Sequence, residues 1–102
     1  MGTFVKVATI DELASGQAKL VEIDHKRIAL FNVSGRYFAI DDACPHRGAP
    51  LSEGELEGET VVCPWHGAIF ELATGEVKRF PAADGVTTYA VRLEGGEIAI
   101  AV

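Results

Sequence analysis

Two short loops that resemble each other contain both cysteines of this chain. The sequence CPHRGAP spans residues 44–50, and CPWHGAI spans residues 63–69. In each loop a proline fixes φ directly after the cysteine, and a histidine and a glycine follow closely. Loops built in this way hold one thiolate and one imidazole each at preset positions, so they predict a preorganised site for a metal ion or cluster. The candidate ligands are Cys44, His46, Cys63 and His66.

Three simpler explanations compete for these cysteines. Buried apolar cysteines are common, but chance would rarely place Cys-Pro beside a histidine twice. A disulfide between Cys44 and Cys63 is disfavoured in a reducing cytoplasm, and it leaves both histidines unexplained. Structural zinc suits the ligand types, although zinc spacing usually pairs cysteine with cysteine and histidine with histidine. Ligand spacing alone therefore leaves structural zinc open.

The segments on both sides of the loops have the pattern of short strands separated by turns. Strands are expected from Phe4 onward and over 19–24, 27–33, 37–40, 87–93 and 98–102. Turns are expected at His25-Lys26, Ser34-Gly35, Thr74-Gly75 and the EGGE run at 94–97. Asp11 is expected to cap a single helical turn that ends at Gly16. Because no βαβ alternation occurs, the sequence predicts an all-β fold with an antiparallel sandwich or barrel as its base.

The length and charge of the chain limit its organisation and its partners. With 102 residues it is expected to form one domain over 1–102, in which residues of about 41–81 make a small two-loop subdomain. The net charge of -6 disfavours nucleic acid and anionic membranes and suits a basic protein partner, although acidity also serves solubility alone. No apolar run approaches the roughly 20 residues of a membrane span, and the first residues lack a signal-peptide pattern. A soluble, cytoplasmic protein is expected.

The two loops and their flanks resemble a known family. The stretches CPHRGAPLSEG and CPWHGAIFELATGE are similar to the Rieske-type ferredoxins of bacterial multicomponent dioxygenases that hydroxylate aromatic rings. The specific resemblance covers residues 41 to about 81, and it disfavours zinc. It implies a [2Fe-2S] cluster, with one iron held by Cys44 and Cys63 and the other by His46 and His66. It also implies a carrier of single electrons from a flavin-containing, NAD(P)H-dependent ferredoxin reductase to a terminal oxygenase.

The sequence departs from the Rieske proteins of quinol-oxidising complexes at four positions. Those proteins have a disulfide between the loops, where this chain has Ala49 and Trp65. They also have a serine and a tyrosine whose hydroxyls bond the cluster region, where this chain has Ala68 and Phe70. Without those hydroxyls the reduced cluster is less stabilised, so a reduction potential of roughly −150 mV is expected. Trp65 itself is expected to cap the apolar side of its loop.

The chain is expected to carry electrons without catalysing a reaction. A mononuclear oxygenase iron needs two histidines and a carboxylate, and only His25 remains after the ligand set. No glycine fingerprint for a nucleotide occurs either.

A second function stays open at this point. The small Rieske-type subunit of an NAD(P)H-dependent nitrite reductase resembles this fold and motif, and the ELATGEV stretch is compatible with both.

Overall fold

The computed structural model describes residues 3–45, 48–65, 67–79 and 85–102. Within these ranges the chain forms eleven β-strands and two short 3-10 helices, η1 (Ile10–Glu12) and η2 (Leu51–Glu53), and it forms no α-helix. No helix in these ranges is long and apolar enough to cross a membrane. The prediction of an all-β fold is therefore confirmed.

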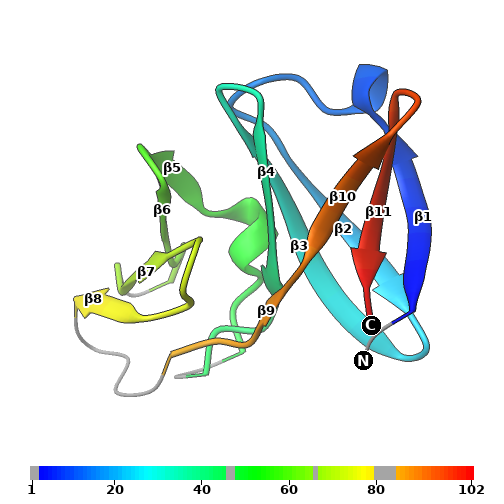
Figure 1. Ribbon diagram of the computed structural model, residues 1–102. Coiled ribbons are helices and arrows are strands. Elements are labelled where there is room, and N and C mark those ends of the chain that lie inside the picture. Colours follow the sequence, from blue (N-terminus) through cyan, green and yellow to red (C-terminus); the bar gives the residue numbers. More distant parts are fainter. Residues whose placement is uncertain (1–2, 46–47, 66, 80–84) are drawn as a thin grey trace.

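The strands form three antiparallel sheets (Figure 1). The outer sheet has the order β1 (Phe4–Thr9), β11 (Glu97–Ala101), β10 (Val91–Glu94). The central sheet has the order β2 (Ala18–Ile23), β3 (Lys26–Val33), β4 (Arg36–Asp41), β9 (Thr88–Tyr89). The small sheet has the order β5 (Glu55–Glu57), β6 (Thr60–Val62), β7 (Ile69–Glu71), β8 (Val77–Arg79). The outer and central sheets make the base, and the small sheet stands beside it with η2, as a base with a two-loop subdomain requires.

Strand β3 lies between the two hydrophobic cores and contributes side chains to both. Its residues Ile28–Phe31 are all fully buried. Ile28 and Leu30 pack in the core between the outer and central sheets. Ala29 and Phe31, which point to the opposite face of the strand, pack in the core beneath the small sheet. A continuous apolar run is what a strand covered on both faces requires. The small sheet and its loops therefore rest on the face of the central sheet that carries Ala29 and Phe31 of β3 and Ile40 of β4.

The predicted strand over 87–93 is divided between two sheets. Strand β9 pairs with β4 in the central sheet, and β10 pairs with β11 in the outer sheet. The two follow one another in nearly one direction in Figure 1 and cross from one sheet to the other. Hydrophobic alternation does not report such a crossing, because both halves alternate in the same way. This crossing ties the two base sheets together.

The tip of the first hairpin lies one residue earlier than predicted. Ile23 pairs with Lys26, so the two turn residues are Asp24 and His25, with φ values of 48° and 69°. A two-residue turn of this kind needs positive φ at both positions, and aspartate and histidine tolerate that region better than most residues. His25 is exposed there. The turn at Ser34-Gly35 is confirmed, with φ values of 53° and 88°.

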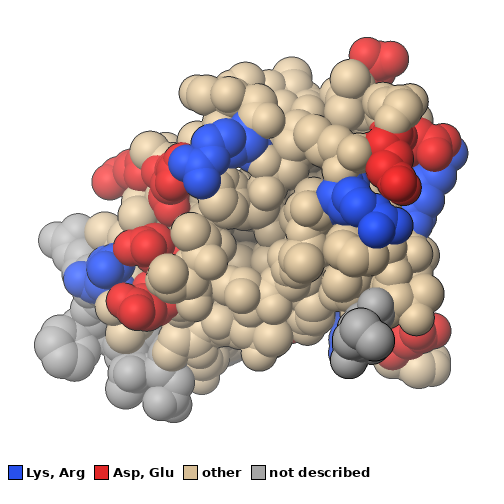
Figure 2. All heavy atoms as spheres, viewed as in Figure 1, with Lys and Arg blue, Asp and Glu red and all other residues tan. Residues whose placement is uncertain are grey.

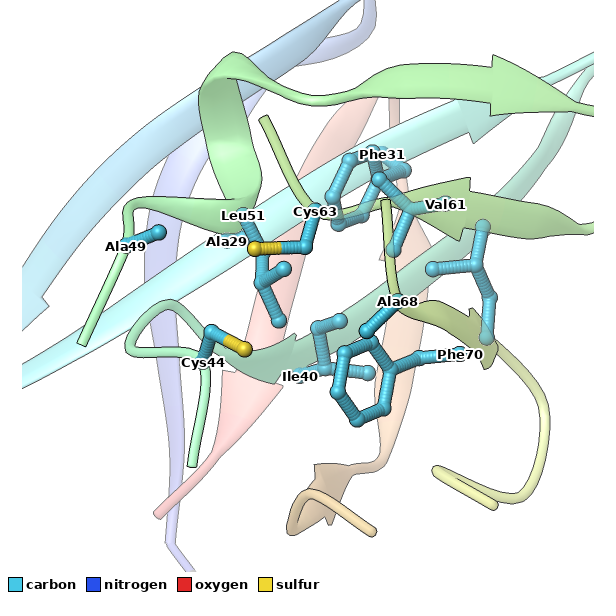
Figure 3. Close-up of a cluster of buried hydrophobic side chains, with 11 residues drawn as sticks. Ala29, Phe31, Ile40, Cys44, Ala49, Leu51, Val61, Cys63, Ala68 and Phe70 are labelled. Atoms are coloured by element: carbon cyan, nitrogen blue, oxygen red, sulfur yellow. The ribbon is translucent and has the colours of Figure 1, made fainter. Parts of the chain in front are cut away.

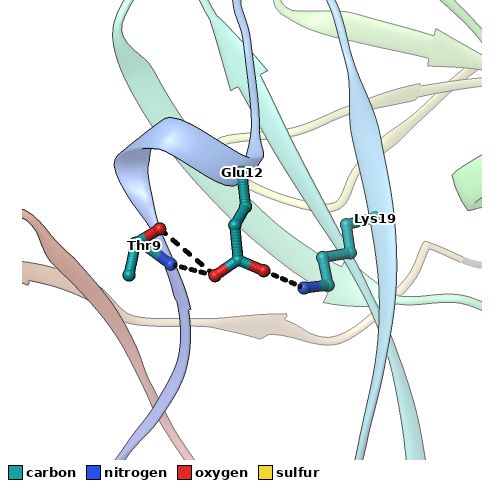
Figure 4. A network of polar contacts seen from close by, with 3 residues as sticks. All are labelled: Thr9, Glu12 and Lys19. Carbon is teal, nitrogen blue, oxygen red and sulfur yellow. Dashed lines mark hydrogen bonds and ion pairs between the residues drawn. The ribbon is translucent and has the colours of Figure 1, made fainter.

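The helical turn after β1 is capped by Thr9 and not, as predicted, by Asp11. The backbone N–H and the hydroxyl of Thr9 both donate to Oε1 of Glu12, at 2.9 and 3.2 Å (Figure 4). Lys19 on β2 donates to the other carboxylate oxygen at 3.1 Å. These bonds, the backbone bond first, hold the pKa of the Glu12 carboxyl below its usual value. The sequence contained this signal, because Glu12 stands three residues after Thr9.

The hydroxyl of Tyr89 is expected to resist ionisation up to about pH 12. Partial burial, followed by a 2.6 Å hydrogen bond donated to Asp41, raises the pKa of Tyr89 to about 12. An unfolded tyrosine ionises near pH 10. The bond therefore stabilises the fold fully below about pH 10, and the contribution is lost as the pH rises through about 12. A titration of phenolate absorbance should show one late step that a Tyr89→Phe variant lacks. A step of ordinary pKa assigned to Tyr89 would contradict the bond.

Candidate metal centre

The first cysteine loop is a tight hairpin closed by backbone hydrogen bonds. The N–H of Cys44 donates to the carbonyl of Ala49 at 2.9 Å, and the N–H of Gly48 donates to the carbonyl of Cys44 at 2.6 Å. Ala43 and Pro50 form an isolated antiparallel bridge just outside these bonds. The loop thus begins and ends at fixed points, with Cys44 at its first position.

The second cysteine loop has the same hydrogen bonds at the same spacing. The N–H of Cys63 donates to Ala68 at 2.7 Å, and the N–H of Gly67 donates to Cys63 at 3.1 Å. Gly67 and its counterpart Gly48 have the same φ of 76°, a region that side chains rarely adopt. Strands β6 and β7 flank this loop and pair Val62 with Ile69. The likeness of the two sequence phrases is therefore a likeness of backbone structure.

Both thiols lie in one apolar cluster beneath the small sheet. Cys44 is 2% exposed and Cys63 is 3% exposed, and no disulfide joins them. Figure 3 shows both side chains on the same side of the cluster, with Leu51 beside them. The disulfide alternative, which the sequence disfavoured, does not occur in this structure. Two buried thiols at equivalent positions of two equivalent hairpins are a donor set that fits a metal centre with cysteine ligands.

Two of the four predicted ligands, His46 and His66, lie outside the described residues. In the remaining part of the chain, no group of three or more histidine, cysteine or carboxylate side chains could hold a metal ion. The described half of the site is thus the cysteine half. Backbone bonds from Gly48 to Cys44 and from Gly67 to Cys63 close the two loops in the described part of the chain.

Among the described residues, the fully buried side chains that share a cluster with the two thiols carry no hydroxyl. Ala49, Leu51, Ala68 and Phe70 are fully buried and belong to the same cluster as the cysteines. Ala68 and Phe70 are the positions at which a serine and a tyrosine are expected in high-potential Rieske proteins. Their burial places them where an added hydroxyl would have no bulk water to bond, so it would bond within the site.

Trp65 does not cap the apolar side of its loop, and that prediction is wrong. Its side chain is 57% exposed, the largest exposed fraction among the large apolar side chains that the structure describes as exposed. Trp65 follows Pro64 in the loop that the backbone bonds of Cys63 close, and it faces solvent there.

The chain belongs to the Rieske [2Fe-2S] domain family. The family model matches residues 3–90, which include both loops and most of the base. A [2Fe-2S] cluster is accordingly the cofactor of this chain, and structural zinc is not. Within that family, the chain is similar to ferredoxins of aromatic dioxygenase systems, and it is of that type.

Two curated relatives show this likeness. The chain is 54% identical over 74 residues to the 3-phenylpropionate/cinnamic acid dioxygenase ferredoxin subunit of Escherichia coli (strain K12), covering 72% of this chain and 70% of the relative. It is 38% identical over 99 residues to the biphenyl dioxygenase ferredoxin subunit of Pseudomonas sp. (strain KKS102), covering 96% of this chain and 91% of the relative.

Solved structures have the same fold. The ferredoxin of carbazole 1,9a-dioxygenase from Nocardioides aromaticivorans IC177 superposes with a TM-score of 0.92 at 31% identity, over 97% of both chains. A chain in a complex of reduced oxygenase and oxidised ferredoxin in carbazole 1,9a-dioxygenase matches at 0.92 and 28% identity, over 99% of this chain and 94% of that one. A structure described as a candidate NADH-dependent nitrite reductase small subunit from Mycobacterium tuberculosis superposes with a TM-score of 0.90 at 25% identity. The match covers 100% of this chain and 96% of that chain.

Proposed function

We propose that this chain is a soluble, cytoplasmic ferredoxin that carries single electrons from a flavin-containing NAD(P)H-dependent reductase to a terminal aromatic-ring dioxygenase. The observation that carries the proposal is the pair of equivalent hairpins, which bury two thiols in one apolar cluster. The chain is an electron-transfer component and not the catalyst, like the ferredoxin subunits that it resembles.

We assign the cluster ligands to the two loops. Cys44 and Cys63 would hold one iron, and His46 and His66 would hold the other, as the family motif implies. When bound, the cluster supplies a centre that gains and loses one electron. The chain itself holds the thiolates at fixed backbone positions and keeps water from the cysteine side, since both cysteines are nearly fully buried.

The proposed partners fit the charge of the chain. The net charge is -6, and on the face shown in Figure 2 acidic side chains gather beside the small sheet. Some of them are already paired there, as Glu59 is with Arg36 and as Glu71 and Glu76 are with Lys78. Unpaired acidic charge speeds encounter with a basic partner surface, and this effect weakens with salt.

An Ala68→Ser substitution is expected to raise the reduction potential of the cluster. Ala68 is fully buried in the same cluster as both cysteines, so the new hydroxyl donates to a sulfur atom of the site and stabilises the reduced form. A rise of tens of millivolts, up to roughly 59 mV for a tenfold change in the reduction equilibrium, is expected in a potentiometric titration.

The matched control for this substitution is Ala39→Ser. Ala39 is also buried, but it lies in the core between the outer and central sheets. The control should leave the potential unchanged. An equal potential in the Ala68→Ser protein and the wild type would mean that residue 68 does not face the cluster.

The nitrite reductase alternative has a structural match but weaker identity. The small-subunit structure is 25% identical to this chain, against 54% and 38% for the two dioxygenase ferredoxins. The decisive experiment is stopped-flow electron transfer. The reduced chain should be reoxidised rapidly by an aromatic-ring terminal oxygenase and reduced rapidly by a flavin reductase with NAD(P)H. Stable co-purification with a large sirohaem subunit, without transfer to an oxygenase, would overturn the proposal.

A further inference from the structure

One buried charge lies at the root of the first cysteine loop. Asp42 is 2% exposed, and among the described residues it is the only charged residue in the buried set, in which Asn32 is the other polar member. It stands two residues before Cys44, between the end of β4 and the hairpin. A buried carboxylate is costly unless it is compensated, so its position calls for a role.

The contacts of Asp42 hold both ends of the loop together. Its Oδ1 accepts the backbone N–H of Ser52 at 2.8 Å, and its backbone carbonyl accepts the N–H of Leu51 at 2.7 Å. Its own N–H donates to the carbonyl of Arg27 on β3 at 3.0 Å. Asp42 thus joins the start of the hairpin, the helix η2 after it and the central strand beneath it.

The negative charge of this carboxylate is only partly compensated. Among the described residues, the ion-pair partner of Asp42 is Arg27, whose Nη2 lies 3.9 Å from Oδ2 and whose side chain is 59% exposed. A largely hydrated guanidinium at that distance is screened by water, whereas the carboxylate, whose side chain is 3% exposed, is screened much less. A net negative field therefore remains on the Cys44 side of the site.

The second cysteine loop has no counterpart to this charge. At the corresponding root, β6 and β7 pair Val61 with Phe70 and Val62 with Ile69, which are all apolar. The two hairpins share their backbone bonds, but only the first one is anchored by a carboxylate. The second loop is held by the same backbone bonds without a charge at its root. Holding the first loop in place therefore does not by itself require the charge of Asp42.

We propose that Asp42 is a positioning residue whose buried negative charge lowers the reduction potential of the cluster. Adding an electron to a centre beside a fixed anion is less favourable, because like charges repel most strongly where water is excluded. The inference rests on the proposed assignment of Cys44 as a ligand. The absence of hydroxyls at Ala68 and Phe70 is one reason to expect a low reduction potential, and the charge of Asp42 is a second, electrostatic reason.

The test is the potential of an Asp42→Asn protein. Asparagine keeps the size and the oxygen that accepts the Ser52 N–H, and it removes the charge. The reduction equilibrium should shift about tenfold toward the reduced form, which is a rise of roughly 59 mV for one electron. The EPR g-values of the reduced state should stay as in the wild type, because the ligands are unchanged.

The matched control is Glu94→Gln, which removes one carboxylate charge at a side chain that is 67% exposed on β10. Its potential should equal that of the wild type. A potential of the Asp42→Asn protein equal to that of this control would overturn the proposal. A wild-type protein with no Rieske EPR signal would instead overturn the proposed function, so the two failures are distinguishable.

A second variant covers the case in which Asp42→Asn does not assemble a cluster. Arg27→Gln removes the partial compensation from an exposed side chain and leaves its backbone bond to Asp42 intact. Because the Arg27 guanidinium is screened by water, the potential of this variant should equal that of the wild type or fall slightly below it. A raised potential in this variant would overturn the proposal, because removing a cation beside an effective anion cannot weaken the negative field.

Discussion

A Cys63→Ser variant is expected to lose the visible absorption and the EPR signal of the cluster together with most of its bound iron. Serine is a poor substitute for the soft thiolate that Fe–S clusters require. Cys63 is 3% exposed and belongs to the core that joins the small sheet to β3, so the variant also places a hydroxyl in an apolar site. Because cluster binding is coupled to folding, the melting temperature should fall as well.

The measurements for this variant are the visible spectrum, iron content and a thermal melt. The matched control is Ala39→Ser, which also places a hydroxyl at a small buried site, but in the other core. The control should keep the full spectrum. A Cys63→Ser protein with the spectrum and iron content of the wild type would show that Cys63 is not a ligand. The same comparison applies to Cys44→Ser.

A Gly75→Ala substitution is expected to destabilise the fold by roughly 3 kcal/mol or more. Gly75 has a φ of 77°, and a Cβ built there would lie 2.0 Å from the backbone carbonyl oxygen of Val86. The N–H of Val86 donates to the carbonyl of Gly75 at 2.8 Å, so the two backbones are held together at this point. A methyl group would break the contact by which the β7–β8 turn meets the chain before β9.

The matched control is Gly96→Ala in the β10–β11 turn. Gly96 has a φ of 81°, and a Cβ there would meet nothing within 4 Å. The free energy of unfolding of this variant should fall by only about 1–2 kcal/mol, which is the cost of placing an alanine at positive φ. Urea unfolding of both variants separates the steric clash from the strain at positive φ. Equal losses of free energy of unfolding in the two variants would contradict the close approach of Gly75 and Val86.

Local patterns in the sequence were sufficient to predict most strands and both cysteine loops. Turn residues and alternation locate β2, β3, β4 and β11 to within about two residues, because each follows from its own side chains. The loops could be predicted because proline, glycine and the ligand types act locally on the backbone. The equivalence of the two hairpins in the structure follows from the same local rules.

Other features depend on contacts between distant segments and could not be predicted. The division of 87–93 into β9 and β10 depends on which sheet each half meets. The exposure of Trp65 depends on the direction of the hairpin tip, and hydrophobicity alone indicated the opposite. The burial of Asp42 depends on η2 folding back over it, whereas an aspartate before a loop ordinarily reads as exposed.

The measurement that most directly tests the central claim is a potentiometric titration of the purified protein, followed by EPR of the reduced state. The account predicts a Rieske-type signal that appears at roughly −150 mV, the low end of the range for such centres. That value would fit electrons supplied by NAD(P)H through a flavin. A Rieske signal at a strongly positive potential, or a colourless and EPR-silent protein, would contradict it.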